Sequence, residues 1–210
     1  MIAPKEEVDA EPNQPQFVDP SVSREKFDAE VAAYRSLERE HQERGWWLLE
    51  AAFPRVFAVF ATPRLTPPAV VCGVLLDFAN YDLEPPSVKL VDPFTRRPYL
   101  MKDLPTVLLR RQFVSIQGLP LAAGTPQMVT AAPMMQAHGP DEIPFLCLPG
   151  VREYHAHPAH TSDSWLSHRG RGEGTLFAIL STIYQYGVQP ISEFNVGLRV
   201  LGFQQGEPPK

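Results

Sequence analysis

A tandem proline in the middle of a series of strand-like segments places the strongest constraint on this sequence. Pro85-Pro86 lies between the apolar run Ala69–Phe78 and the shorter run Ser87–Val91. Proline fixes φ, lacks an N–H and disfavours helix in the preceding residue, so the chain must cross between these two runs without a helix. Two further runs, Trp46–Ala52 and Arg55–Ala61, precede them with short turns between. Consecutive short strands of this kind predict an antiparallel meander of about four strands.

Two helices are expected beside this meander. Residues 21–44 repeat apolar side chains at spacings of three and four, and Gly45 stops the repeat. Residues 175–186 form a second apolar segment bounded by Gly174 and Gly187. The order of helix, meander, irregular segment and helix predicts an α+β fold with helices against one face of the sheet. The apolar stripe of the first helix consists of Phe27, Val31, Tyr34 and Leu37.

The remaining segments indicate one domain, at about residues 21–205, with additions. Residues 1–20 are acidic and contain four prolines, so we expect a disordered tail. Residues 92–142 contain seven prolines and little periodicity, which is typical of an insertion or a flap. Residues 191–203 are expected to add one more strand.

Composition excludes several classes of protein. The 210-residue chain has a net charge of −5 and no dense Lys/Arg block, which argues against nucleic acid as a partner. Two cysteines in a chain of this length argue against a secreted disulfide scaffold. The N-terminus lacks a signal peptide, and the longest apolar stretch is far short of the ~20 residues of a membrane helix. We therefore expect a soluble, cytoplasmic protein without a membrane partner.

Two short motifs stand out in the sequence. The first is the stretch Phe78-Ala-Asn-Tyr-Asp-Leu-Glu-Pro-Pro-Ser-Val-Lys-Leu90, which resembles a hallmark of the ubiquitin-conjugating enzyme family, in which a tyrosine and a Pro-Pro pair connect the third and fourth strands. Leu146-Cys147-Leu148 resembles the signature around the family's active-site thiol. His138 lies nine residues before Cys147, near the place of the family's His-Pro-Asn turn. Both expected helices also fall where the family has its first helix and its crossover helix.

This resemblance implies a ubiquitin-conjugating-like fold and an acyl transfer activity. Cys147 would accept a ubiquitin-like protein as a thioester from a ubiquitin-activating-type enzyme and pass it to an amine of a protein acceptor. Adenylation would belong to the activating enzyme, so no cofactor is expected here. The long stretch between Leu90 and Cys147 is closer to the diverged bacterial relatives, which are often encoded in antiviral defence operons.

One departure keeps a second hypothesis open. No asparagine occurs between Asn80 and Asn195, whereas the family is thought to support the oxyanion with a side-chain amide. The chain could therefore be a catalytically inactive binding module that docks a ubiquitin-like protein. If it is active, a backbone N–H, Gln136 or a histidine must donate instead. His138, His155 and His157 are the candidates for this catalytic role.

The two cysteines are expected to differ. Cys147 ends a short apolar run before Pro149-Gly150, which predicts an accessible nucleophile at a strand end. Cys72 lies within an all-apolar run and is expected to be a buried structural residue.

The histidine-rich loop also allows a metal interpretation. His155, His157 and His160 could hold zinc in a metal-dependent hydrolase. No carboxylate or second cysteine lies at a firm ligand spacing, so we expect no metal.

Overall fold

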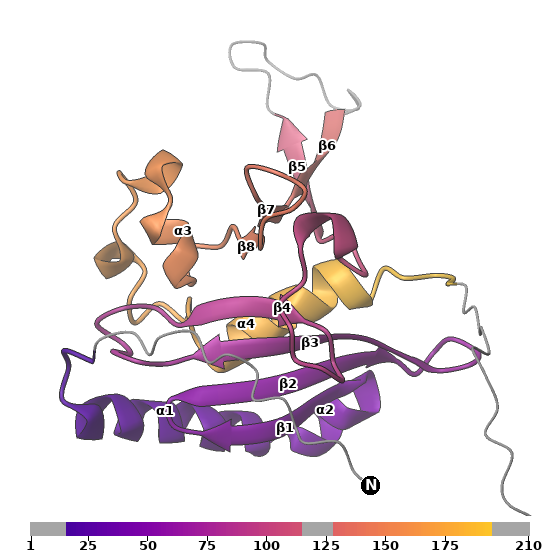
Figure 1. The fold of residues 1–210 in the computed structure, drawn as a ribbon. Helices are drawn as coiled ribbons and strands as arrows, with labels where there is room; N and C mark the ends of the chain where they lie inside the picture. Colours follow the sequence, from indigo (N-terminus) through magenta and orange to yellow (C-terminus); the bar gives the residue numbers. More distant parts are fainter. Residues whose placement is uncertain (1–15, 115–127, 195–210) are drawn as a thin grey trace, which may run out of the picture.

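A four-stranded antiparallel sheet with helices packed against it forms the centre of the protein (Figure 1). The structure is a computed structural model that describes residues 16–114 and 128–194. Strand order is β1-β2-β3-β4, so the meander of about four strands in an α+β fold is confirmed. The strands are β1 Trp46–Ala52, β2 Arg55–Thr62, β3 Ala69–Asp77 and β4 Ser87–Val91, and the longer helices are α1 Pro20–Arg35, α2 Glu38–Arg44 and α4 Leu176–Ile183.

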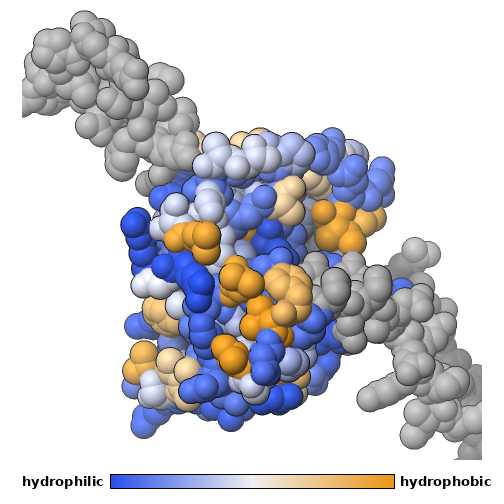
Figure 2. Space-filling view, turned by 90° about the vertical axis from the view of Figure 1, so that its left-hand side faces the viewer, coloured by the Kyte–Doolittle hydropathy of each residue, from blue (hydrophilic) through white to orange (hydrophobic). Residues whose placement is uncertain are grey.

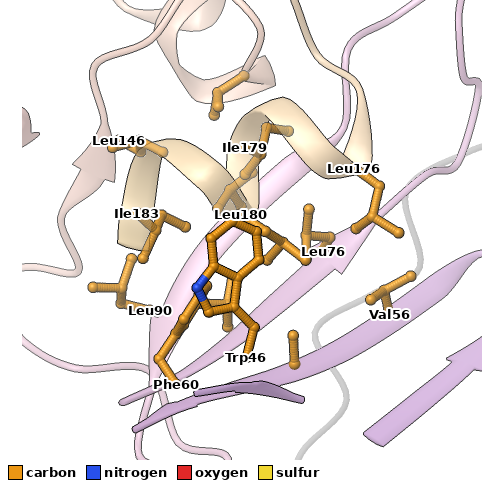
Figure 3. Packing of buried hydrophobic residues seen from close by; sticks show 14 of the residues in the cluster. Trp46, Val56, Phe60, Leu76, Leu90, Leu146, Leu176, Ile179, Leu180 and Ile183 are labelled. Carbon is orange, nitrogen blue, oxygen red and sulfur yellow. The ribbon is translucent and has the colours of Figure 1, made fainter. Parts of the chain in front are cut away.

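The core lies between this sheet and helices α1 and α4. Alternate residues of β2 point to opposite faces because side chains alternate along a strand. Val56 and Phe60 join the main core, whereas Phe57 and Val59 belong to a smaller cluster on the other face. Trp46 and Phe60 of the sheet pack beneath the apolar side chains of α4 (Figure 3). The buried residues that α4 contributes are Leu176, Ile179, Leu180 and Ile183.

The first predicted helix is two helices in the structure. Helix α1 ends at Arg35, and α2 begins at Glu38 after a turn at Ser36 and Leu37. The Ser36 hydroxyl donates to the Ala33 carbonyl oxygen, and this local bond competes with continued helix. Leu37, expected in the buried stripe, is therefore 47% exposed, and a histidine of α2 takes a buried place instead.

Helix α4 begins at Leu176, as the glycine at 174 predicted. Thr175 caps its N-terminus by accepting from the Ala178 N–H. Glu30 of α1 accepts from the Leu176 N–H and from the Tyr81 hydroxyl, each at 3.0 Å. This carboxylate therefore joins α1, the loop after β3 and the N-terminus of α4. A π-helical turn, η4 Tyr184–Val188, extends the helix.

The segment predicted as an insertion contains regular elements. Strands β5 Leu109–Val114 and β6 Met128–Pro133 form a hairpin that projects away from the four-stranded sheet (Figure 1). Strands β7 Met135–Gln136 and β8 Phe145–Leu146 form a second small sheet. The other short elements are η1 Met101–Asp103, α3 Arg152–Ala156, η2 Pro158–His160 and η3 Trp165–Ser167.

Some sequence predictions concern residues outside the described ranges. The predicted tail at 1–20 falls mostly there, since residues 1–15 are not described. The N–H groups of Phe17 and Val18, however, both donate to the buried Asn80 side chain, at 2.9 and 3.1 Å. Residues 195–203 of the predicted last strand also lie outside. Of the helices in the described part, none is long and apolar enough to cross a membrane.

The surface at one end of the sheet carries a small patch of hydrophobic residues. Figure 2 shows the face at the left of Figure 1, where hydrophobic residues gather near the centre and hydrophilic residues surround them. Most of this view is hydrophilic.

Candidate functional site

Cys147 directly follows β8, at the end of a strand. The Cys147 N–H donates to the Met134 carbonyl oxygen at 2.7 Å, which extends the pairing of β8 with β7 by one residue. The side chain is half-buried, whereas Cys72 on β3 is fully buried. The expected difference in exposure between the two cysteines is thus confirmed.

A tight turn after Cys147 leads into α3. The Val151 N–H donates to the Leu148 carbonyl oxygen at 2.9 Å and closes this turn. Gly150 lies so close to Gly174 that a Cβ on Gly150 would meet the Gly174 nitrogen at 2.2 Å. The cysteine loop is therefore packed directly against the segment that begins α4.

Helix α3 connects the cysteine loop to the Pro85-Pro86 crossover. The Arg152 N–H donates to the Pro86 carbonyl oxygen at 3.0 Å, and its guanidinium donates to the carbonyl oxygens of Pro85 and Ala79 at 3.1 and 2.6 Å. Glu153 accepts from the Ser87 hydroxyl and from the Val88 N–H at the start of β4. The two sequence motifs, far apart in the chain, are thus held together in space.

His160 is the histidine that contacts the thiol. Its Nε2 lies 3.5 Å from Cys147 Sγ. The ring of Tyr154 stacks on the His160 ring, with centroids 3.9 Å apart and planes inclined by 19°. Sequence reasoning placed His160 only in the metal hypothesis, so it missed this thiol–imidazole pair.

The three histidines expected to serve in catalysis have other contacts. His157 stacks on Phe145 at 5.0 Å and on His138 at 5.3 Å between ring centroids, and its ring is 5.6 Å from that of His160. His155 has one ring nitrogen beside the Asp163 carbonyl oxygen at 2.8 Å and the other beside the Pro149 carbonyl oxygen. A ring held between two carbonyl oxygens serves as a structural tie across the loop.

Burial disfavours the thiolate form of both cysteines. It raises the pKa of Cys147 above its ordinary value and the pKa of the fully buried Cys72 to about 12. Cys147 at rest is therefore mainly a thiol, and its conversion to a nucleophile requires a base that accepts the proton. His160 is placed for that role.

A charged network anchors the loop that carries these residues. The Tyr154 hydroxyl donates to Asp163 Oδ2 at 2.8 Å, and Asp163 Oδ1 lies 2.6 Å from His168 Nε2. His168 Nδ1 lies 2.9 Å from Glu173. The hydrogen bond with Asp163, and then that with Glu173, raises the pKa of His168, while the hydrogen bonds from His168 and Tyr154 lower the pKa of Asp163.

The metal hypothesis finds no support in the described residues. Within residues 16–114 and 128–194, no group of three or more His, Cys, Asp or Glu side chains could hold a metal ion. His155 is engaged with backbone carbonyl oxygens, and His157 Nδ1 accepts from the Ala159 N–H at 3.3 Å. His155 lies in α3 and His160 in η2, so the histidine-rich loop is folded into short helical turns.

Comparisons with known proteins place the chain in a family. A model of the Y4jH family, described as Y4jH-like, matches residues 18–191. The uncharacterized protein y4jH of Sinorhizobium fredii (strain NBRC 101917 / NGR234) is 43% identical over 195 residues. That similarity covers 88% of this chain and 91% of the relative. The matched residues include both motifs, the sheet and α4.

Proposed function

This chain belongs to the Y4jH-like family, and we propose that it is a ubiquitin-conjugating-type enzyme that carries a ubiquitin-like protein as a thioester on Cys147. The observation that carries the proposal is the half-exposed Cys147 thiol at a strand end with His160 Nε2 at 3.5 Å. A nucleophile and a base within hydrogen-bond reach are the pair that acyl transfer through a covalent intermediate requires.

The arrangement around this pair supports the same proposal. The four-stranded meander, the Pro85-Pro86 crossover and α4 occur in the order that the resemblance to ubiquitin-conjugating enzymes implies. Arg152 and Glu153 attach the crossover to the residues that follow Cys147. The features of the two motifs therefore belong to one site.

In the proposed loading step, the Cys147 thiol gives its proton to His160 Nε2, in the tautomer that carries its own proton on Nδ1. The thiolate attacks the carbonyl carbon of the activated C-terminus of the ubiquitin-like protein. A carbon–sulfur bond to Cys147 forms, the bond to the activating enzyme's leaving group breaks, and that group takes up a proton. The raised pKa of Cys147 makes the nearby base necessary.

In the proposed transfer step, an amine of the acceptor attacks the thioester carbon. An amide bond forms, the carbon–sulfur bond breaks, and Cys147 regains a proton while the amine loses one. The tetrahedral oxyanion needs a donor, and one such donor is typically worth about 3 kcal/mol. His157 and His138 stack near the pair and remain the candidates, whereas His155 is tied to two carbonyl oxygens.

A loading assay tests the proposal. The protein is mixed with its cognate activating enzyme, ATP and ubiquitin-like protein, and a conjugate that reducing agent destroys is expected. Cys147→Ser should give a reductant-resistant oxyester or no conjugate, whereas Cys72→Ser should leave the thioester in place. His160→Ala should slow loading on the order of a hundredfold because the thiol loses its base.

The same assay decides the catalytic roles of the other histidines. His138→Ala and His157→Ala are expected to load normally, and a variant that discharges to an amine about a hundredfold more slowly identifies the oxyanion donor. Absence of any thioester with a verified cognate set, together with retained binding of the ubiquitin-like protein, would replace the enzyme proposal with the binding module.

A further inference from the structure

We propose that Tyr154 is a positioning residue that holds His160 against Cys147, with Asp163 and His168 as its anchor. The catalytic meaning of this inference rests on the proposed function, but the geometry stands independently of it. Tyr154 stacks on the His160 ring, so it acts through His160.

His160 needs a positioning residue because its ring lacks the usual support. A catalytic base is commonly oriented by a third group that binds its second nitrogen. Within residues 16–114 and 128–194, no hydrogen-bond partner is found for His160 Nδ1, and the ring's polar contact is with Cys147. The stacked ring of Tyr154, 3.9 Å away between centroids, takes the place of that third group.

The stack also suits the protonated form of His160. When His160 takes the thiol proton it becomes a cation lying face to face with an aromatic ring, which attracts positive charge. Burial and the hydrogen bond to Asp163 raise the pKa of Tyr154 to about 12, so its ring stays a neutral phenol at neutral pH. Tyr154 can thus stabilise the imidazolium without competing for the proton.

The anchor fixes the Tyr154 ring at its far end. Its hydroxyl donates to Asp163 Oδ2, and Asp163 Oδ1 binds His168, which also binds Glu173. His168 donates to both carboxylates when its ring carries two protons, and its raised pKa favours that form. The Tyr154 ring is anchored through its hydroxyl and stacks on His160 with its face, and this favours a single position of the His160 ring.

The experiment measures alkylation of Cys147 and the environment of His160, neither of which needs a partner protein. Iodoacetamide rates from pH 6 to 10 are compared for the natural protein, His160→Ala, Tyr154→Leu and the double variant. Tyr154→Leu should slow alkylation at pH 7 on the order of tenfold, as His160→Ala does, while the rates should converge as the pH rises, because hydroxide then removes the thiol proton without help. The double variant should be no slower than either single variant, because Tyr154 acts only through His160 and its loss costs nothing more once His160 is absent.

Nuclear magnetic resonance of the His160 ring supplies the readout that a structural defect would not mimic. The Tyr154 ring current should move the His160 ring protons upfield, and Tyr154→Leu should abolish this shift. Tyr154→Phe keeps the stacked ring but loses the hydroxyl bond to Asp163, so it should keep part of the upfield shift and give an alkylation rate between those of the natural protein and Tyr154→Leu.

The outcomes separate this inference from the proposed function. An unchanged His160 shift in Tyr154→Leu, or independent losses that multiply in the double variant, would overturn the positioning role. If Tyr154→Leu does not fold, Asp163→Ala removes the anchor instead and should broaden the His160 signals and slow alkylation at pH 7. A positive result here with a negative loading assay would retain the positioned pair and discard the acyl transfer.

Discussion

His41 lies in the core with neither ring nitrogen hydrogen-bonded to any described residue. Its ring stacks on Trp46 with centroids 4.9 Å apart and planes inclined by 2°, and Tyr34 packs on it at 4.5 Å. Burial, and then the charge of Arg44, lowers the pKa of His41. The neutral imidazole is therefore the form that fits this aromatic site.

This residue gives the fold a dependence on acid. Because the pKa of His41 is lower in the folded than in the unfolded protein, its contribution to stability is full above about pH 6.5 and is lost as the pH falls below that value. We predict that the free energy of unfolding decreases below pH 6.5 less steeply in His41→Phe than in the natural protein. Urea unfolding at several pH values measures the difference.

His168 provides the control for this prediction, because its pKa is shifted in the opposite direction to that of His41. Because the pKa of His168 is raised in the folded protein, its contribution to stability is full below its pKa in the unfolded protein and is lost as the pH rises. His168→Gln should therefore not remove the loss of stability in acid. At pH 7, His41→Phe should be neutral or stabilise by about 1 kcal/mol, since two unpaired buried nitrogens disappear. Identical acid profiles for His41→Phe and the natural protein would refute the assignment.

At the scale of single residues, the sequence predicted the exposure of the two cysteines, which depends on their neighbours in the chain, but not the pairing of His160 with Cys147. The all-apolar neighbours of Cys72 and the proline after Leu148 were enough to separate a buried from an accessible cysteine. The pairing of His160 with Cys147 depends on how α3 and η2 fold back over the thiol. That path is set by tertiary contacts such as Arg152 with the Pro86 carbonyl oxygen, which no periodicity reveals.

Among the elements, the loop after Cys147 is fixed by a backbone contact between two glycines. A side chain on Gly150 would collide with the backbone of Gly174, and neither backbone can give way as a flexible side chain would. Gly150→Ala must therefore move the cysteine loop away from the start of α4. We predict a loss of about 3 kcal/mol in the free energy of unfolding, measured by urea denaturation.

Gly139 provides the matched control for this substitution. A Cβ at Gly139 would find no atom within 4 Å, and the glycine belongs to the same segment of the chain between β7 and α3. Gly139→Ala should change stability by less than about 0.5 kcal/mol. Equal effects of the two substitutions would mean that the close approach at Gly150 is not what holds the loop.

Elements with strong local patterns were predictable, and those without were not. The four strands and α4 follow from apolar runs bounded by proline and glycine. The β5–β6 hairpin was missed because Leu108-Leu109 and Arg110-Arg111 interrupt the alternation that identifies a half-buried strand. The break between α1 and α2 was missed because the apolar spacing continues through it, while the bond from Ser36 to Ala33 ends the helix.

At the scale of the whole molecule, the main core of the described residues joins the four-stranded sheet to α1 and α4, and Cys72 lies inside it. The thiol has no exposed surface, sits on β3 between β2 and β4, and has its pKa raised to about 12. A reagent can reach it only when the sheet opens. The half-buried Cys147 does not depend on such an opening.

We therefore predict two separate labelling reactions in native protein, with Cys147 modified well before Cys72. In a Cys147→Ser background, the labelling rate of Cys72 should rise with urea at the slope of global unfolding, because β3 opens only with the whole core. In a Cys72→Ser background, the labelling rate of Cys147 should depend weakly on urea below the unfolding transition. Mass spectrometry of peptides measures both rates. Labelling of Cys72 first, or a shallow urea dependence of its rate, would show instead that the sheet opens locally at β3 while the rest of the main core stays folded.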